Sequence, residues 1–286
     1  MNPANNLKMA PLFLIVGLAQ PTLANLHSLD DLIEKGIVQL NFSGNGGHTE
    51  DCITLRASNL GSEFLTTRIE PGRTLIAADA HEQNIVVTQE LILAMQPNQV
   101  LERQVYGFCY QSLDAGPAFG SEFTLGAVDQ GTLAKVADFL NRHRDIPSAT
   151  QQEAIWVVSD CHPLSSIHSY DEATEALANY VADVLGLEKP WYTTDHVKTV
   201  DALFTRQIER VYGEIPFDVG SYATLTISIL DQNGRVMKRL VRATRYGPGQ
   251  YTQPVDIQVR NWPAGEYAVR FEEDQQGLVK EETFVL

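Results

Sequence analysis

Three cysteines are the side chains with the most distinctive chemistry in this chain. Cys52 and Cys109 both fall on predicted strands, and Cys161 lies in a later segment. If the chain is exported, the first expectation is a disulfide between Cys52 and Cys109. That bond would close a loop of about 57 residues and stabilise the fold by roughly 3–4 kcal/mol. Cys161 would then be the unpaired cysteine.

A second chemistry for Cys109 comes from two short motifs. Gly107-Phe-Cys-Tyr110 is followed by the segment Ala149-Thr-Gln-Gln-Glu-Ala-Ile-Trp156. Together they resemble the thioester domains of Gram-positive surface adhesins, which carry an aromatic-Cys motif on a strand and a later Gln-x-x-Ile-Trp helix. The resemblance implies an internal thioester between the side chains of Cys109 and Gln152.

The thioester would form when the Cys109 thiolate attacks the Gln152 amide carbon and ammonia leaves. The resulting acyl group is activated for attack by an amine of a partner, which gives covalent adhesion. Gln152 shares a predicted helix face with Ile155 and Trp156, where a buried amide needs a partner. Cys109 cannot form both bonds, so the disulfide is the first expectation and the thioester is the alternative.

Other catalytic or metal-binding signals are weak. Asp160, His162 and His168 follow one another closely, but no Cys-x-x-Cys or His-x-x-x-His spacing accompanies them. The sequence has no Gly-x-Ser-x-Gly elbow and no Walker-type loop. We therefore expect a non-enzymatic protein with no catalytic residue, cofactor or metal. A secreted hydrolase stays open, and a deep pocket that gathers acids and histidines from the first 217 residues would favour it.

Composition limits the class of protein. The chain has 286 residues, 44% hydrophobic, which is enough for one large or two medium domains. It carries 21 basic and 36 acidic residues, a formal charge of −15. Such a field repels polyanions, so we expect no nucleic-acid partner.

The first segment, Met1–Ala24, has the pattern of a targeting sequence. Its single charge is Lys8, and the apolar run Leu12–Val16 lies between Pro11 and Pro21. A membrane-spanning helix needs about 20 apolar residues, and this run is shorter. We expect a signal peptide, cleaved near Ala24, and no transmembrane segment. The protein should be exported to the outer cell surface or the medium, with the periplasm left open.

The predicted secondary structure changes from strands to helices along the chain. Residues 36–127 contain short alternating runs bounded by Gly, Pro and Asn, which predict an antiparallel, β-sandwich-like domain. Residues of about 130–213 change to a helical period. The first predicted helix has an apolar stripe of Leu133, Val136, Ala137 and Leu140.

Three further helices are expected. One opens at Ser148, with Gln151 as its capping-box partner, and the next opens near Ser169, with Glu172 in that role, and ends at Gly186. The last carries Val197, Val200, Phe204, Ile208 and Val211.

After Phe217 the pattern returns to alternation and the charge becomes balanced, with 8 basic and 9 acidic residues in 218–286. Leu225 to Val236, with its Asn-Gly turn, precedes Pro263-Ala-Gly-Glu-Tyr267 and a final strand over Lys280–Leu286. This order resembles the C-terminal sorting domain of the type IX secretion system and the related immunoglobulin-like module of flagellar hook-capping proteins. The resemblance implies that residues 218–286 contact a secretion machinery.

The sequence therefore predicts an α+β multidomain protein. After the signal peptide, residues 25–217 form the β-rich domain with a helical second half, and residues 218–286 form an all-β, immunoglobulin-like domain. We expect a secreted or cell-surface binding or adhesion protein whose protein or surface ligand is not specified. The covalent adhesin with a Cys109–Gln152 thioester is the first alternative, and the hydrolase is the second.

Overall fold

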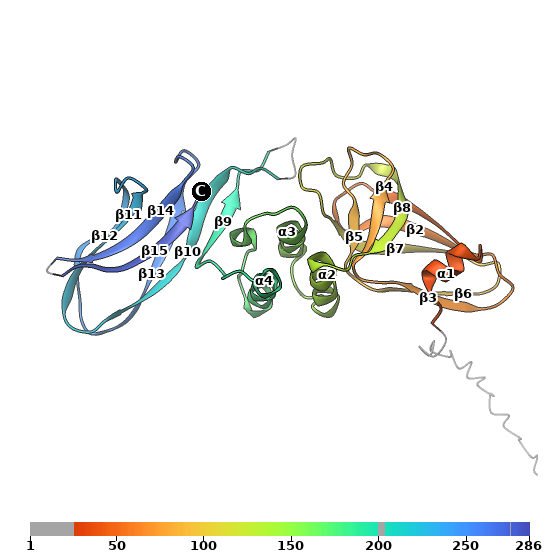
Figure 1. The fold of residues 1–286 in the computed structure, drawn as a ribbon, viewed down its shortest axis with the longest axis horizontal. Helices are drawn as coiled ribbons and strands as arrows, with labels where there is room; N and C mark the ends of the chain where they lie inside the picture. Colours follow the sequence, from red (N-terminus) through yellow and green to blue (C-terminus); the bar gives the residue numbers. More distant parts are fainter. Residues whose placement is uncertain (1–25, 200–203, 275) are drawn as a thin grey trace, which may run out of the picture.

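The computed structural model describes residues 26–199, 204–274 and 276–286, so the expected signal peptide, Met1–Ala24, lies outside the described residues. Strands form the largest share of the described chain and helices a much smaller one, which confirms the predicted β-rich fold. A barrel lies at one end of the elongated molecule, three helices lie in the middle, and the C-terminal sheets lie at the other end (Figure 1).

Eight strands build the N-terminal part: β1 (Val38–Asn45), β2 (Thr49–Asn59), β3 (Leu65–Ile69), β4 (Arg73–Ala77), β5 (Ile85–Val87), β6 (Leu91–Met95), β7 (Val100–Cys109) and β8 (Phe119–Val128). Six of them close into a barrel in the order β1-β2-β7-β5-β4-β8, while β3 and β6 form a separate two-stranded sheet. The region is therefore a barrel and not the expected sandwich-like pair of sheets. Closure depends on β8, which pairs with both β1 and β4. A short helix, α1 (Leu29–Glu34), contacts β1 and β3.

Three helices form the middle layer: α2 (Thr132–Arg142), α3 (Ser148–Ser159) and α4 (Glu172–Leu185). They contact one another, and α3 also contacts β2 and β7 of the barrel. The predicted stripe of α2 is buried, as expected for a helix with one apolar face. In the described part of the chain, no helix is long and apolar enough to span a bilayer.

The start of α3 is confirmed, but its predicted cap is wrong. The helix begins at Ser148 after Pro147, which lacks a side chain that could accept a backbone hydrogen bond. Gln151 instead donates its side-chain amide to the carbonyl oxygen of Ile146 at 2.6 Å. Gln151 is buried, and its side-chain amide is bonded to a residue just before the helix.

The predicted start of α4 at Ser169 is too early. The helix begins at Glu172, and its capping box consists of Asp171 and Thr174, because these two residues exchange side-chain and backbone hydrogen bonds. The predicted end is confirmed, since Gly186 adopts the left-handed conformation (φ 66°) that commonly ends helices.

The predicted fourth helix is wrong. Part of it, including Val200, lies outside the described residues, and Ile208–Val219 forms strand β10. The physical reason is that the apolar residues at the end of this segment recur at every second position, which places them on one face of a strand. Strand β10 buries one face on the C-terminal core through Val211, Ile215, Phe217 and Val219.

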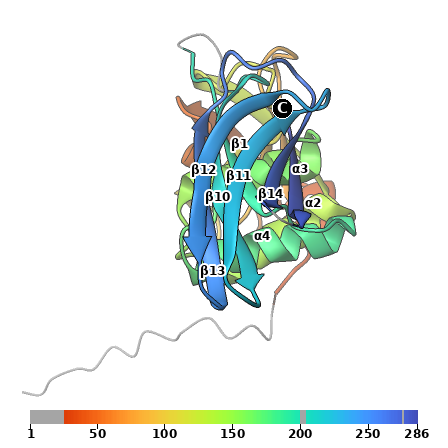
Figure 2. The same cartoon turned by 90° about the vertical axis from the view of Figure 1, so that its left-hand side faces the viewer.

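The C-terminal part consists of two sheets. Its other strands are β9 (Tyr192–His196), β11 (Ala223–Asp231), β12 (Val236–Tyr246), β13 (Gly249–Gln258), β14 (Glu266–Glu273) and β15 (Gly277–Val285). The sheet orders are β13-β10-β9 and β12-β11-β14-β15, and both sheets contribute to one core. Figure 2 views this end of the molecule, with long strands of both sheets toward the reader. The expected boundary at Phe217 falls inside β10, which pairs with β13 from Arg210 to Val219.

Candidate functional site

Strand β7 carries Cys109 at its end, where the barrel meets the helices. Side chains alternate across a strand, so neighbouring residues face opposite sides. Phe108 packs in the helical core, whereas Cys109 packs in the barrel core. Gly107 permits close pairing with β5, because a Cβ at this position would lie 2.7 Å from both Ile85 Cγ2 and the carbonyl oxygen of Val86. The end of β7 is thereby fixed between the two cores.

Helix α3 places Gln152 directly against Cys109. The Gln152 side chain is 3% exposed, and its Nε2 donates to the carbonyl oxygen of Cys109 at 2.6 Å. This contact is to the backbone carbonyl of Cys109, whereas the Cys109 side chain packs in the barrel core. The structure therefore brings together the two residues that the sequence named as the thioester candidates.

Two atoms of α3 are left without partners. Gln152 Oε1 and Trp156 Nε1 are buried and have no hydrogen-bond partner in the described part of the chain. The first is an acceptor and the second is a donor. An unsatisfied buried polar group costs about 1–3 kcal/mol, so such groups are uncommon in folded proteins.

All three cysteines are free thiols in the structure, so the expected Cys52–Cys109 disulfide is not formed there. Cys52 and Cys109 are both buried in the barrel core, and Cys161 is exposed. Burial raises the pKa of the Cys52 thiol to about 12 and that of the Cys109 thiol well above its usual range. Neither buried sulfur is therefore an ionised thiolate at neutral pH.

A polar clamp ties the loop after β7 to the end of α3. The carboxylate of Asp160 accepts hydrogen bonds from both the backbone N–H and the hydroxyl of Ser112. His162 Nε2 lies 2.8 Å from the same hydroxyl, and its ring stacks on Phe204 at 3.7 Å between centroids. Burial lowers the pKa of His162 to about 4, which keeps the imidazole neutral. Because Asp160 contacts the serine directly, the three residues form a structural clamp and lack the Ser-His-Asp order of a hydrolase triad.

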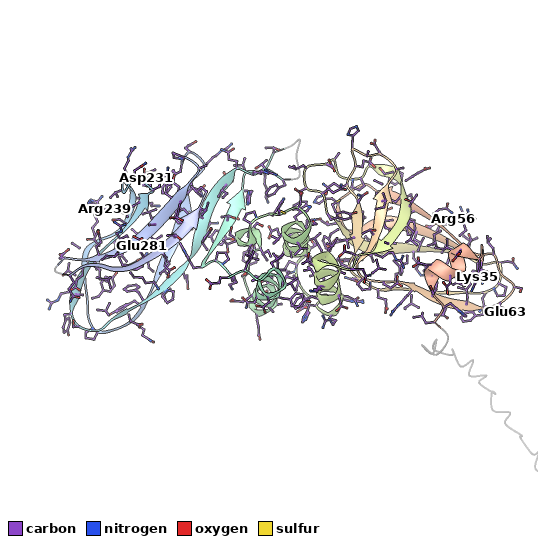
Figure 3. All side chains as sticks on the ribbon, viewed as in Figure 1. Lys35, Arg56, Glu63, Asp231, Arg239 and Glu281 are labelled. Carbon is purple, nitrogen blue, oxygen red and sulfur yellow. The ribbon has the colours of Figure 1, made fainter. Side chains whose placement is uncertain are left out.

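A pocket of about 720 Å³ opens beside Gln152. It is bordered by His48 and Thr49 from the barrel, by Gln152, Glu153 and Trp156 from α3, and by β9 and neighbouring residues. His48 also holds the end of β7, because its carbonyl oxygen accepts the backbone N–H of Cys109 at 3.1 Å. Charged residues such as Arg56 and Arg239 lie on the outer surface of the molecule (Figure 3).

The pocket also holds a cluster of ionisable side chains that the sequence did not place together. His168 lies between Glu153 and Asp195, with Nδ1 3.3 Å from Glu153 Oε1 and Nε2 3.0 Å from Asp195 Oδ1. Burial raises the pKa of Glu153 to about 8, although the backbone N–H of His168 partly opposes this shift. Arg210 extends the group, 3.4 Å from Asp195, and binds Asp256 with two contacts of 2.7 Å.

The sequence motifs therefore located part of the site. The expected cluster of Asp160, His162 and His168 divides into the clamp and the pocket, and Glu153 was missed although it follows Gln152 directly. Asp195 was missed because its segment was assigned to no element. In the described ranges, no three His, Cys, Asp or Glu side chains are arranged to hold a metal ion.

Comparisons with known proteins give remote likenesses. No protein-family model and no curated protein sequence matches the chain. The chain is similar to a β-glucosidase from Kluyveromyces marxianus in complex with glucose, with 11% identity and a TM-score of 0.20, over 82% of this chain and 44% of that one. It is also similar to the CBM51-2 and INT domains of ZmpB from Clostridium perfringens, with 10% identity and a TM-score of 0.15, over 84% of this chain and 73% of that one. The chain thus spans less than half the length of the β-glucosidase, and at these TM-scores the likenesses support neither a shared fold nor a shared activity.

Proposed function

We propose that this chain is a surface protein that binds its partner covalently through an internal thioester between Cys109 Sγ and the side-chain carbon of Gln152. One observation carries the proposal: the buried amide of Gln152 contacts Cys109 itself, at 2.6 Å from Nε2 to the carbonyl oxygen. Of the two bonds that the sequence left open for Cys109, this contact favours the thioester.

Bond formation needs the Cys109 thiol to turn from the barrel core toward the Gln152 amide. The Gln152 amide already lies against the backbone carbonyl of Cys109. The carbon–sulfur bond then forms, the carbon–nitrogen bond breaks, and ammonia leaves with the thiol proton. Holding the two groups together makes this step effectively unimolecular, which can supply a large part of the barrier reduction.

The surroundings suit a long-lived thioester. Cys109 and Gln152 are both nearly inaccessible to solvent, at 0% and 3% exposed, so water has little access to the bond. The pocket beside Gln152 gives one open side, from which an amine of a partner can reach the carbonyl carbon. That attack forms an amide and releases Cys109 as a thiol, which leaves the two proteins joined.

The remaining parts fit a protein of the cell surface. The motifs of residues 218–286 resemble a sorting domain, and these residues lie in sheets remote from the barrel end of the molecule (Figure 1). Met1–Ala24 supplies the export signal in this proposal. Residues 218–286 would then address the chain to a secretion machinery, while the barrel and helices carry the reactive bond.

Intact-mass measurement tests the proposal directly. The wild-type protein should be lighter than its sequence by about 17 Da, the mass of ammonia, and methylamine should add to Gln152 and free the thiol of Cys109. Cys109→Ala should abolish both effects, whereas the matched control Cys161→Ala, at an exposed cysteine, should retain them. A deficit of about 2 Da that returns on reduction would identify a disulfide instead and overturn the proposal.

A hydrolase is the second candidate, and the pocket favours it by holding His168 between two carboxylates. Buried acids with a raised pKa and a neighbouring imidazole are a common arrangement for proton transfer. The test is turnover of chromogenic esters and glycosides: Glu153→Gln should abolish it while Cys109→Ala retains it. Absence of turnover in the wild type would reject this candidate and leave the thioester proposal untouched.

A further inference from the structure

The two unpartnered atoms of α3 are complementary. Gln152 Oε1 is a buried acceptor and Trp156 Nε1 is a buried donor, and neither has a hydrogen-bond partner among the described residues. The two residues are four positions apart on one helix, so their side chains lie on the same face, one turn apart. Both also border the same pocket.

The histidines around the pocket face other groups. His162 Nε2 contacts the Ser112 hydroxyl, and His168 Nδ1 faces Glu153. His168 Nε2 lies 3.0 Å from Asp195 Oδ1 without making a hydrogen bond to it, and His168 belongs to the segment after α3. His196 Nδ1 lies 2.9 Å from the carbonyl oxygen of Thr205. The indole N–H of Trp156 is therefore the donor on α3 that is held ready without an acceptor.

We propose that Trp156 is a catalytic residue whose indole N–H stabilises the negative charge that develops on Gln152 Oε1. This inference rests on the proposed thioester. When a nucleophile attacks the Gln152 carbon, the carbon–oxygen π electrons move to Oε1 and leave an oxyanion beside the α3 face. A fixed donor in a water-poor site stabilises such charge strongly, because it needs no reorganisation at the moment of reaction.

The same donor acts in both reactions, the formation of the thioester and its attack by an amine. In thioester formation the Cys109 sulfur attacks, the carbon–sulfur bond forms, and ammonia departs with the thiol proton. In adhesion a neutral amine attacks, the carbon–nitrogen bond forms, and the carbon–sulfur bond breaks. The amine proton passes to sulfur, so Cys109 leaves as a thiol, as its raised pKa requires. Both steps pass through an oxyanion on Gln152 Oε1.

The decisive experiment removes the N–H and keeps the shape of the side chain. Trp156 is replaced by 3-benzothienylalanine, in which sulfur occupies the place of the indole N–H, in the full-length chain. The rate of methylamine incorporation is then measured by intact mass, and folding is checked by thermal melting. The matched control carries the same replacement at Trp262, which packs on Tyr267 in the C-terminal part.

Loss of one oxyanion donor should slow methylamine incorporation on the order of 10²-fold with an unchanged melting temperature, and the Trp262 control should react at the wild-type rate. A folded Trp156 variant that never loses ammonia also supports the proposal, because thioester formation needs the same donor. A variant that carries the thioester and reacts at the wild-type rate overturns this inference and leaves the proposed function standing. A wild-type protein without the mass deficit overturns both.

Discussion

Cutting the thioester without removing any side chain should destabilise the part of the protein that contains the barrel and the helices. Methylamine converts Gln152 into a substituted amide that keeps an N–H for the Cys109 carbonyl, so the hydrogen bond of the structure can persist. What is lost is the covalent link between β7 and α3. The treatment therefore isolates the effect of the cross-link on the unfolded chain.

The size of the effect follows from the positions of the two residues, which are 43 apart in the sequence. A cross-link that closes a loop of this length removes unfolded-state entropy worth about 4 kcal/mol in the chain-entropy model. For a unit of roughly 150–200 residues, about 4 kcal/mol corresponds to a fall in Tm of about 8–16 °C.

Thermal melting followed by circular dichroism, before and after methylamine, measures this fall. Cys109→Ala lacks the link, so methylamine should not change its Tm, and Cys161→Ala should behave as the wild type. Complete methylamine incorporation with an unchanged Tm would refute the entropic reasoning, since the link would then contribute nothing to the stability.

Three further predictions concern other parts of the structure. Burial in the folded protein raises the pKa of Glu153 to about 8, so the native state binds a proton more tightly than the unfolded chain. The free energy of unfolding should therefore fall as the pH rises from about 4.5 to 8, and Glu153→Gln should flatten this dependence in denaturant titrations. Arg73 is 3% exposed and forms ion pairs with Asp30 and Glu70. Arg73→Met should therefore lower the free energy of unfolding in urea by about 3 kcal/mol. The control Asp30→Asn, at an exposed partner, should lower it by less than about 1 kcal/mol. Limited proteolysis should cut the exposed connection 187–189 and spare β10, because β10 is paired with β13; a primary cut at 213–220 would contradict the strand assignment.

The sequence predicted well where the signal was local and repeated. The stripe of α2, the start of α3 at Ser148 and the glycine end of α4 all depend on residues within one or two turns of each other. Alternation likewise predicted most of the strands. The fourth helix failed because Val197, Phe204 and Val211 have helical spacing by coincidence, while burial on the C-terminal sheets follows the period-two face of β10.

The choice of cap at α4 shows the same limit. Ser169 and Glu172 fit the capping-box pattern, yet in the structure the exposed Asp171 and the buried Thr174 form the capping box. Competing local patterns have nearly equal energies, so tertiary packing decides between them.

For the site, the sequence by itself determined the reactive types and their order: a cysteine after an aromatic residue on a strand, then a glutamine and a tryptophan one turn apart on a helix. It could not decide which bond Cys109 favours, because that depends on which group packs against the end of β7. Only the tertiary structure places the Gln152 amide at the Cys109 carbonyl, leaves Gln152 Oε1 and Trp156 Nε1 unpartnered, and brings Asp195 to His168 across the pocket. This arrangement depends on closure of the barrel and on the packing of α3 against it. A linear sequence pattern specifies neither of these, because both bring together segments that are distant in the chain.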